Sequence, residues 1–526
     1  MTSVIVAWFT DKVELCFTND SMSGVSKVMS VAPIGFDGRL VEVESDTKKG
    51  LPSIQIVGLG NKAIDEAKER VRSAINNSLL DFPARKITIN LAPAELPKDG
   101  THYDLPIALA ILAGSGQLRQ AELNGAVFAG ELALDGSLRP IKGAISITET
   151  AREAGYAKVY LPFANIEQAC LVEDIEVVGV SSLKELFLHL KGEVKVKPTN
   201  RKQFTANQRE SGPILDDIHG QEQAKRAILI AAAGHHNILL TGSPGAGKTM
   251  LANTLNSLLP PLSAKEKVAV TKIQSLAGES LEEISVERPF RSPHHTASRV
   301  ALIGGGGKPK PGEISLAHLG VLFLDEIPEY PRATLESLRQ PLEDKKVAIS
   351  RANGNVSYPA NFMLVATMNP CPCGYYGDTS KECTCSSTQI LAYQQRLSGP
   401  LMDRIDLVIN VGRVPNDTLL DHSTSKNSQQ TAAKKLMENA IIAQSERYNS
   451  SDMYNSTLSS RDVKQFVKLS TEVRQLLMQA TQKLNISARS YFKIIKVART
   501  IADLDGKDQV DTNHIAEALQ YRHTTS

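Results

Sequence analysis

A glycine-rich segment near the middle of the chain lies between a run of apolar residues and a helical pattern. It reads NILLTGSPGAGKTMLANTL and contains the spacing G-x-x-x-x-G-K-T. Glycines at these positions let backbone N–H groups face an anion at the start of a helix, while the lysine and the hydroxyl supply a cation for phosphates and a ligand for Mg²⁺. The segment therefore predicts a nucleoside triphosphate site made of Gly242, Ser243, Pro244, Gly245, Ala246, Gly247, Lys248 and Thr249.

Two neighbouring carboxylates follow a second strongly apolar run. The sequence VLFLDEIPE places Asp325 and Glu326 at the end of a strand pattern. Two acids at such a place are, by themselves, most often a solvated turn. Downstream of a phosphate loop, however, the first acid is suited to hold Mg²⁺ together with Thr249, and the second to orient or deprotonate an attacking water. We therefore expect hydrolysis of the nucleotide, with Lys248, Asp325 and Glu326 at the catalytic centre.

A third strand pattern, NFMLVATMN, ends in Asn369. The neutral amide can position the water or sense the terminal phosphate without adding negative charge. The order of phosphate loop, acid pair, Asn-ended strand and helical C-terminal region resembles that of AAA+ ATPases, and the resemblance extends across residues 213–526. It implies that the nucleotide is ATP.

Further motifs narrow the resemblance to the magnesium-chelatase-like ATPases of the YifB and ComM type. These motifs are PFRSPHHTAS, PGEISLAHLGVLFLDEIPE, NPCPCGYYGD, SGPLMDRIDL and SARSYFKIIKVARTIADL. By this resemblance Arg404 is the arginine finger that reaches the ATP of a neighbouring subunit, and Arg489 is the sensor arginine at the γ-phosphate. Either arginine alone would more often form a surface salt bridge.

The resemblance also implies a task. A protein of the ComM type is expected to form a homo-hexameric ring that moves along single-stranded or branched DNA, as a helicase that promotes branch migration in natural transformation and recombination. The alternative is a chelatase-like or chaperone-like ATPase that remodels a protein partner. A third interpretation, a nucleotide-gated scaffold, would require an incomplete active site. Stimulation of ATP hydrolysis by DNA would separate the first function from the others.

Four cysteines lie close together just after Asn369. They are Cys371, Cys373, Cys383 and Cys385. Four thiolates suit tetrahedral Zn²⁺ in number and softness. Because the pairs are C-x-C rather than the commoner C-x-x-C, an iron–sulfur cluster and unligated or redox-active thiols are alternatives. We expect a structural Zn²⁺ in an insertion at 371–385.

Two basic segments are candidates for the lining of a ring pore. The loop RVALIGGGGKPKPGEIS carries Lys308 and Lys310, and LEDKKVAISRANGNVSYPA predicts a hairpin with an NG turn, near Lys345, Lys346 and Arg351. Six copies would make a basic channel that grips DNA phosphates, whereas the alternative is a pair of ordinary solvated loops. The overall charge does not distinguish between these two alternatives, because the formal net charge is only +2.

The rest of the sequence must form the elements that position these residues. With 526 residues the chain is too long for one hydrophobic core. Alternating strand and helix patterns predict an α/β multidomain fold. Its parts are an extension at 1–28 without clear periodicity, an α/β domain at 29–191, a polar linker at 192–212, a second α/β unit with a parallel sheet at 213–412, and a helical lid at 413–526. The sequence has neither a membrane-spanning apolar run nor a secretory signal pattern, which favours a cytoplasmic protein.

The first α/β domain resembles the proteolytic domain of Lon proteases, which has a ribosomal S5 domain 2-like fold. The resemblance is carried by LAPAELPKDGTHYDLPIALAIL and GELALDGSLRPIKGAISITETAREAGYAKVYLP. Aligned with that family, His102 stands in place of the serine nucleophile and Ile145 in place of the lysine base. Isoleucine can neither accept a proton nor activate a hydroxyl. We therefore expect the fold to be retained without peptidase activity, leaving ring scaffolding or DNA contact as its role.

Overall fold

The computed structural model describes residues 25–58, 62–96, 98–199, 212–279, 281, 284–306, 310–351, 354–378, 381–414 and 428–522. These residues form two compact units. The first contains the chain up to Val31, Leu40–Arg139 and Val180–Lys197, and the second contains Ala32–Arg39, Pro140–Gly179 and the chain from Pro198 onward. Most of the expected extension and the greater part of the expected linker lie outside the described residues.

The first unit contains five neighbouring strands of a mixed seven-stranded sheet, in the order β3-β4-β2-β1-β5. The strands are β1 (Val25–Ile34), β2 (Asp37–Lys48), β3 (Ser53–Val57), β4 (Lys86–Ala92) and β5 (Ala126–Phe128). β2 pairs antiparallel with β4, while β3 pairs parallel with β4 and β1 parallel with β5. β1 begins at Val25, so the final residues of the expected extension are part of a regular strand.

Helices and a short ribbon complete this unit. They are α1 (Lys62–Asn77), α2 (Asp104–Gly114), α5 (Leu183–Leu190), and the antiparallel pair β6 (Glu131–Leu132) and β7 (Leu138–Arg139). Every residue of α2 from Asp104 to Leu112 is buried. Because a helix that is apolar on all sides must be enclosed, DLPIALAIL forms the centre of the unit's core.

The segment Pro140–Gly179 belongs to the second unit. It forms α3 (Ala144–Glu153), β8 (Lys158–Pro162), α4 (Ile166–Ala169) and most of β9 (Glu176–Val180). α3 packs against α8 (Ala264–Ala277), where the buried ammonium of Lys272 pairs with Glu149. These partners lie 123 positions apart in the chain. Such long-range contacts leave no local signal in the sequence.

The second unit is centred on a five-stranded sheet with the order β11-β14-β17-β10-β18. The strands are β11 (Phe290–Arg291), β14 (Val321–Leu324), β17 (Met363–Met368), β10 (Ile238–Thr241) and β18 (Leu407–Asn410). All pairings are parallel, as the sequence predicted. β14 and β17 are buried along their whole length, which explains why they read as unbroken apolar runs.

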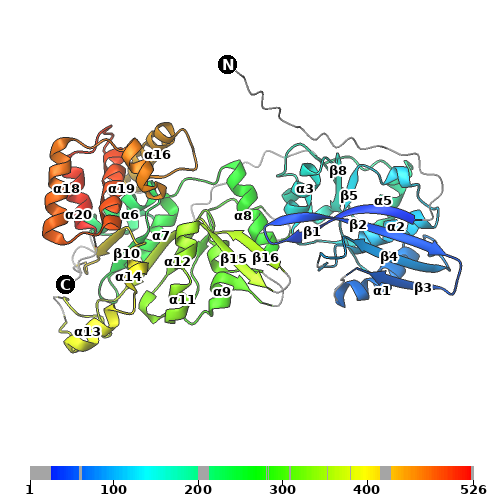
Figure 1. The fold of residues 1–526 in the computed structure, drawn as a ribbon, viewed down its shortest axis with the longest axis horizontal. Helices are drawn as coiled ribbons and strands as arrows, with labels where there is room; N and C mark the ends of the chain where they lie inside the picture. Colours follow the sequence, from blue (N-terminus) through cyan, green and yellow to red (C-terminus); the bar gives the residue numbers. More distant parts are fainter. Residues whose placement is uncertain are drawn as a thin grey trace, which may run out of the picture. The chain divides into compact units, whose positions relative to one another are not determined.

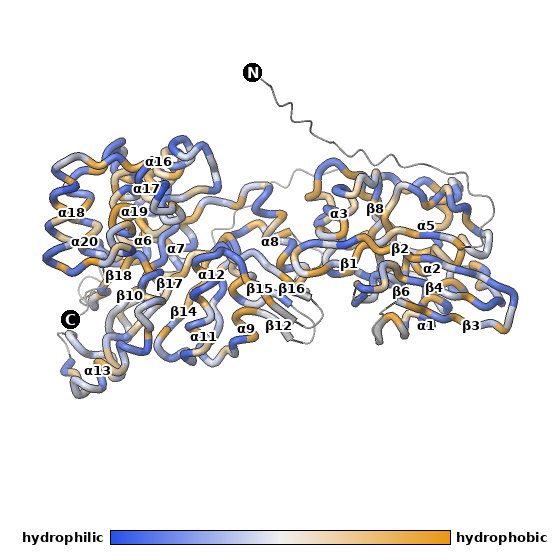
Figure 2. Tube along the Cα trace, viewed as in Figure 1, coloured by the Kyte–Doolittle hydropathy of each residue, from blue (hydrophilic) through white to orange (hydrophobic). Residues whose placement is uncertain are grey.

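Helices surround this sheet and form the C-terminal region. α6 (Glu222–Gly234) contacts α7 (Lys248–Leu258), α16 (Ser428–Tyr448) and α19 (Ala488–Leu504), which lie close together in Figure 1. The other helices of this region are α17 (Ser460–Phe466), α18 (Thr471–Leu484) and α20 (Thr512–Gln520). Hydrophobic and hydrophilic residues alternate along α18 and α20 (Figure 2), as amphipathic outer helices require. The predicted helical C-terminal region is therefore confirmed.

Shorter elements connect these parts. They are α9 (Arg299–Ile303), β12 (Gly304–Gly305), β13 (Lys310–Pro311), α10 (Glu313–Leu316), α11 (Arg332–Glu336), α12 (Arg339–Asp344), β15 (Lys346–Arg351), β16 (Gly354–Pro359), α13 (Ser387–Gln394) and α14 (Gly399–Met402). In the part of the chain that the structure describes, no helix combines the length and the apolar character needed to cross a membrane.

Candidate functional site

The phosphate loop joins the end of β10 to the start of α7. Gly245 and Gly247 have φ angles of +78° and +84°, a left-handed conformation that favours glycine. At Gly242 a Cβ atom would lie 2.3 Å from the carbonyl oxygen of Val411, so a side chain there would displace the backbone. The sequence thus places glycine where the turn requires it, and α7 begins at Lys248 with its first amides available for an anion.

Lys248 lies where the phosphate loop meets β17. Its Nζ donates to the carbonyl oxygens of Gly242 and Ser243, at 2.6 and 3.1 Å, and to Oδ1 of Asn369 at 3.0 Å. Burial lowers the pKa of Lys248, and the charges of Asp325 and Glu326 oppose that effect. The predicted cation, amide and acid pair therefore come together at the carboxyl ends of three adjacent strands.

Thr367 connects the two carboxylates, a role that the sequence motifs did not indicate. Its hydroxyl donates to Oδ1 of Asp325 at 2.5 Å and accepts the backbone N–H of Glu326 at 2.9 Å. Glu326 has a left-handed backbone with φ 48°, and its Oε1 lies 3.4 Å from Nδ2 of Asn369. Thr367 lies in β17 and precedes Asn369, the residue after the strand, by two positions, so continued side-chain alternation could have placed both on one face.

Replacing Thr367 by valine tests this role. Valine has nearly the same shape but loses the donor to Asp325 and leaves the Glu326 amide without its acceptor. We expect kcat for ATP hydrolysis to fall about tenfold, which corresponds to about 1.4 kcal/mol of transition-state stabilisation. Thr367→Ser keeps the hydroxyl and should retain most of the rate. A native kcat in Thr367→Val would show that the hydroxyl does not position the acids.

The arrangement fits Mg²⁺ bound to a nucleoside triphosphate. Thr249 is exposed in the first turn of α7, and Asp325 is exposed at the end of β14. A hydroxyl and a carboxylate are oxygen ligands of the kind that Mg²⁺ prefers. Glu326 adds a second carboxylate, whose Oε1 faces the amide of Asn369. Chemically, this set can bind phosphates and accept a proton from water.

Arg404 lies just before β18 and has several partners within its own chain. Its Nη2 pairs with Oε2 of Glu343 at 2.7 Å, and its Nε and Nη1 donate to the carbonyl oxygens of Arg339 and Pro400. The side chain is only 12% exposed. Its guanidinium is thus held in one place.

Arg489, at the start of α19, lies beside Arg404. It is 63% exposed, and its guanidinium nitrogens lie 3.8 Å from Glu343 and 3.8 Å from Asp403. Glu343 therefore contacts both of the arginines that the sequence singled out. Nothing in the sequence indicated this carboxylate, because its partners are far away along the chain.

The four cysteines form one cluster. Their sulfur atoms all lie within 4.8 Å of one another. The Cys371–Cys373, Cys371–Cys383 and Cys373–Cys383 sulfur distances are 3.3, 3.6 and 3.5 Å, too long for disulfides. Tetrahedral Zn²⁺ with bonds of about 2.3 Å to sulfur needs sulfur atoms slightly farther apart than this, so a small adjustment would accommodate the ion.

Backbone amides also point at the sulfur atoms. The N–H of Cys373 donates to Sγ of Cys385, and the N–H of Cys385 donates to Sγ of Cys383, both at 3.4 Å. The amide of Tyr375, with smaller contributions from other donors, lowers the pKa of Cys373 to about 5. For Cys383 the Cys385 amide acts in the same direction, but desolvation and the neighbouring thiols outweigh it and raise the pKa to about 12. Four thiols this close cannot all ionise without a cation among them.

The predicted basic hairpin forms, but its lysines are not at its turn. β15 and β16 pair antiparallel from Lys346↔Pro359 to Arg351↔Gly354. Arg351 is therefore next to the turn, while exposed Lys346 lies at the opposite end. Lys345 follows the end of α12 in a left-handed conformation, and burial lowers its pKa. Lys345 and Lys346 thus do not lie near the NG turn, contrary to our expectation.

The second basic loop is described only in part. Lys310 is exposed in β13, which pairs with β12. Lys308 lies outside the described residues. Of the two lysines that we named in this loop, Lys310 is the one that the structure describes.

The two positions that we aligned with a Lon-type dyad from the sequence, His102 and Ile145, are both buried. Nε2 of His102 lies 3.1 Å from the carbonyl oxygen of Val31, and burial lowers the pKa of this histidine to about 4. A buried, neutral imidazole is placed for packing and not for attack on a substrate. In the second unit, Ile145 lies in a small apolar cluster with Leu171 and Val172.

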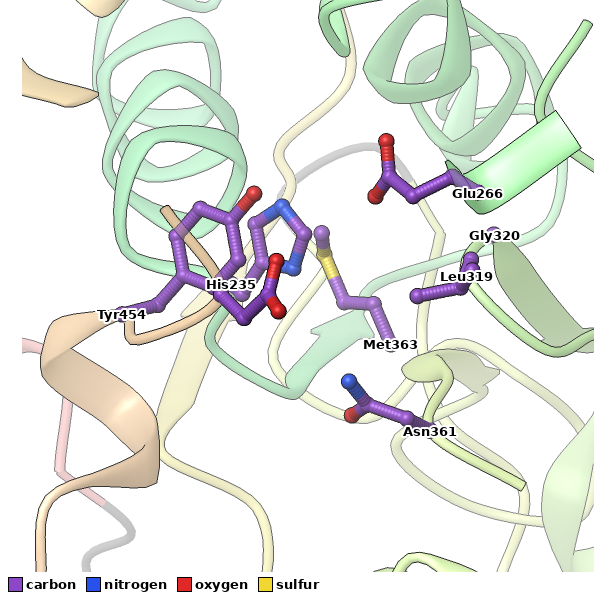
Figure 3. Close-up of a pocket in the computed structure, with 8 residues that line it drawn as sticks. His235, Glu266, Leu319, Gly320, Asn361, Met363 and Tyr454 are labelled. Atoms are coloured by element: carbon purple, nitrogen blue, oxygen red, sulfur yellow. The ribbon is translucent and has the colours of Figure 1, made fainter. Parts of the chain in front are cut away.

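A small pocket of about 50 Å³ lies at the other end of the parallel sheet from the phosphate loop. Its lining residues include His235, which precedes β10, and Met363, the first residue of β17. The rings of His235 and Tyr454 stack with their centroids 3.6 Å apart (Figure 3). The pocket is too small for a nucleotide, and ligands of parallel α/β sheets bind at the carboxyl ends of the strands.

The strand order and the site agree with an AAA+ protein, and family models relate the chain to magnesium chelatase. The family model "Magnesium chelatase, subunit ChlI" matches residues 214–419, its C-terminal model matches 426–522, and "Subunit ChlI of Mg-chelatase" matches 43–165. The magnesium-chelatase 67 kDa subunit of Heliobacterium mobile is 27% identical over 215 residues, which are 35% of this chain and 32% of that protein.

Similarity over almost the whole chain identifies the narrower family. The uncharacterized protein YifB of Escherichia coli (strain K12) is 43% identical across 95% of this chain and 97% of its own length. The competence protein ComM of Haemophilus influenzae is 42% identical across 94% of this chain and 97% of its own length. The chain belongs to the YifB/ComM family of magnesium-chelatase-like AAA+ proteins.

Proposed function

We propose that the chain is a Mg²⁺-dependent, ring-forming ATPase that drives movement along DNA. The observation that carries the ATPase part is the meeting of Lys248, Asp325, Glu326 and Asn369 at the carboxyl ends of adjacent parallel strands. The cation, the pair of carboxylates and the neutral amide come from three separate segments of the chain. They meet at one edge of the sheet. Such a set is typical of a phosphoryl-transfer site and not of a structural cluster.

Each residue has a defined part in hydrolysis. The Lys248 ammonium, now bonded to two loop carbonyls and to Asn369, exchanges these partners for phosphate oxygens. Thr249 and Asp325 hold Mg²⁺, which supplies charge stabilisation to the phosphates when bound. Glu326 accepts the proton of the attacking water. Asn369 and Thr367 contact Glu326 and fix the direction in which its carboxylate points.

The ring part of the proposal rests on Arg404 and Arg489. Both contact Glu343, so both cations belong to one region of the subunit, at which Arg489 and Glu343 are exposed. Within the described residues, they form ion pairs with Glu343 and Asp403 and not with the acids of the nucleotide site. We therefore propose that this surface completes the ATP site of the next subunit in a homo-hexamer, with Arg404 as the finger and Arg489 as the sensor arginine.

The DNA part is supported by the likeness to the competence protein ComM and by the basic hairpin. In a ring, Lys310, Lys346 and Arg351 of each subunit would line a channel for single-stranded or branched DNA. The task would then be helicase-driven branch migration during natural transformation and recombination. The partial likeness to a magnesium-chelatase subunit favours the second candidate, a motor that remodels a protein partner.

The pore proposal is tested with Lys346→Ala/Arg351→Ala. We expect this double variant to lose stimulation of ATP hydrolysis by DNA, because each substitution takes away a cation that binds a phosphate. The logarithmic salt dependence of DNA affinity should also become shallower, by about one unit for each cation removed. Lys468→Ala/Lys483→Ala removes the same charge from exposed positions of the helical region and should keep the stimulation. Equal stimulation in both double variants would exclude the hairpin as the DNA-binding element.

Two further assignments belong to this proposal. The four cysteines hold a structural Zn²⁺, since their number, spacing and amide hydrogen bonds match a thiolate site. The N-terminal region has a Lon-protease-like fold without peptidase activity and serves as a ring scaffold or a DNA contact. Buried His102 and Ile145 at the dyad positions support the loss of peptidase chemistry.

A further inference from the structure

The loop that carries the cysteines touches the phosphate loop. Gly374 follows Cys373 and has a φ angle of +85°. A Cβ atom on Gly374 would lie 2.6 Å from Cδ and 2.7 Å from Cγ of Pro244. The backbone of the cysteine loop therefore packs directly on the ring of a phosphate-loop residue, with no room for a side chain between them.

Arg413, just after β18, forms a second connection. Its Nη2 donates to the carbonyl oxygen of Pro244 at 3.2 Å, and its Nε lies 3.5 Å from Oδ2 of Asp378. Its guanidinium also lies over the ring of Tyr375, 5.5 Å from the centroid. Tyr375 and Asp378 both belong to the segment between the cysteine pairs, so one guanidinium joins that segment to the phosphate loop.

A third connection runs through the residues that follow β17, which begin with Asn369. Cys371 is fully buried and follows Asn369 by two residues. Asn369 in turn contacts Lys248 and Glu326. Gln394 of α13 donates to the carbonyl oxygen of the intervening Pro370 at 3.2 Å. The first cysteine is thus fixed next to the amide of the candidate active site.

We infer that binding of a metal ion by the four cysteines is coupled to binding of ATP, with Gly374 and Arg413 as the positioning residues. A bound ion holds Cys371–Asp378 in the shape that packs Gly374 on Pro244 and keeps Asp378 beside Arg413. Without the ion the segment gains conformational freedom, and the phosphate loop must be ordered when the nucleotide binds. The inference rests on the proposed zinc and ATP sites, and coupling between two sites is necessarily reciprocal.

The test uses the full-length protein with Zn²⁺ and a fluorescent ATP analogue. Zinc content is measured by mass spectrometry before and after removal by a chelator, and the Kd of the analogue is measured in both states. We expect the stripped protein to bind the analogue at least fivefold more weakly and Zn²⁺ to restore the native Kd. Saturating ATP should strengthen Zn²⁺ binding by the same factor. Equal Kd values with and without Zn²⁺ would overturn the coupling.

Variants separate coupling from metal binding. Arg413→Ala and Gly374→Ala keep all four thiols and should bind one Zn²⁺ per chain. In these variants the ratio of the Kd without Zn²⁺ to the Kd with Zn²⁺ should fall toward one. Arg474→Ala, an exposed position in α18, is the matched arginine control and should keep the full effect. If Zn²⁺ changed the Kd as strongly in both Arg413→Ala and Gly374→Ala as in the native protein, these two residues would not connect the sites.

The failures are distinguishable. Protein that takes up no Zn²⁺ overturns the metal site and this inference, but not the ATPase. Protein that binds Zn²⁺ but no nucleotide overturns the proposed function itself. Protein that binds both Zn²⁺ and nucleotide, with neither ligand changing the affinity for the other, overturns only the coupling.

Discussion

Glu326→Gln is expected to reduce the rate of ATP hydrolysis by about 10²- to 10⁴-fold, the usual contribution of a general base. Glutamine has the shape of glutamate but cannot accept the proton of the attacking water. The backbone N–H of residue 326 would still donate to Thr367, so the left-handed turn should persist. The affinity for ATP should change by less than about threefold, because Lys248 and the phosphate loop are untouched.

Steady-state hydrolysis and equilibrium nucleotide binding measure the two parts of this prediction. Glu329→Gln is a matched control, since Glu329 is an exposed carboxylate close by that pairs with Arg396 and not with the site. It should hydrolyse ATP at the native rate. Native turnover by Glu326→Gln would remove Glu326 from its catalytic role.

Arg404→Ala is expected to lose about 10³-fold or more in hydrolysis rate, as is typical when an arginine finger is removed. Nucleotide binding should persist, because Arg404 contacts Glu343 and two backbone carbonyls and not the phosphate loop of its own chain. Thermal unfolding of Arg404→Ala and Arg404→Lys would reveal any general loss of structure. A native rate in Arg404→Ala would exclude the finger assignment.

Mixed rings test whether Arg404 acts on a neighbour. Arg404→Ala and Lys248→Ala subunits are each inactive in the proposal, but the Arg404→Ala subunit keeps an intact phosphate loop and the Lys248→Ala subunit keeps an intact finger. In an equimolar mixture about a quarter of the interfaces would combine the two intact halves. We expect measurable hydrolysis in mixed rings only. No recovery in rings shown to be mixed would place the finger in its own subunit.

The parallel sheet and the nucleotide residues were predictable because their signal is local. β10, β14 and β17 are short buried strands that read as apolar runs, and each is followed closely by a residue with phosphate chemistry. The carboxyl ends of neighbouring parallel strands meet at one edge of the sheet. Position at a strand end was therefore enough to bring Lys248, Asp325 and Asn369 together.

Features that depend on distant partners were not predictable. Glu343 contacts arginines far away in the sequence, and the packing of Gly374 on Pro244 joins segments that are also far apart along the chain. Lys345 looked like a hairpin residue because the run LEDKKVAIS does not reveal where the preceding helix ends. The helix ends at a left-handed cap at Lys345, and the sequence pattern did not mark that residue as the end.

The rate of ATP hydrolysis by the full-length protein, with and without DNA, tests the central claim most directly. Single-stranded, duplex and four-way-junction DNA would be compared, with Lys248→Ala as the blank. We predict hydrolysis that is absent in Lys248→Ala, is stimulated by DNA, and loses that stimulation as salt is raised. Hydrolysis by the native chain that is indifferent to every DNA would contradict a DNA motor and favour the remodelling of a protein partner.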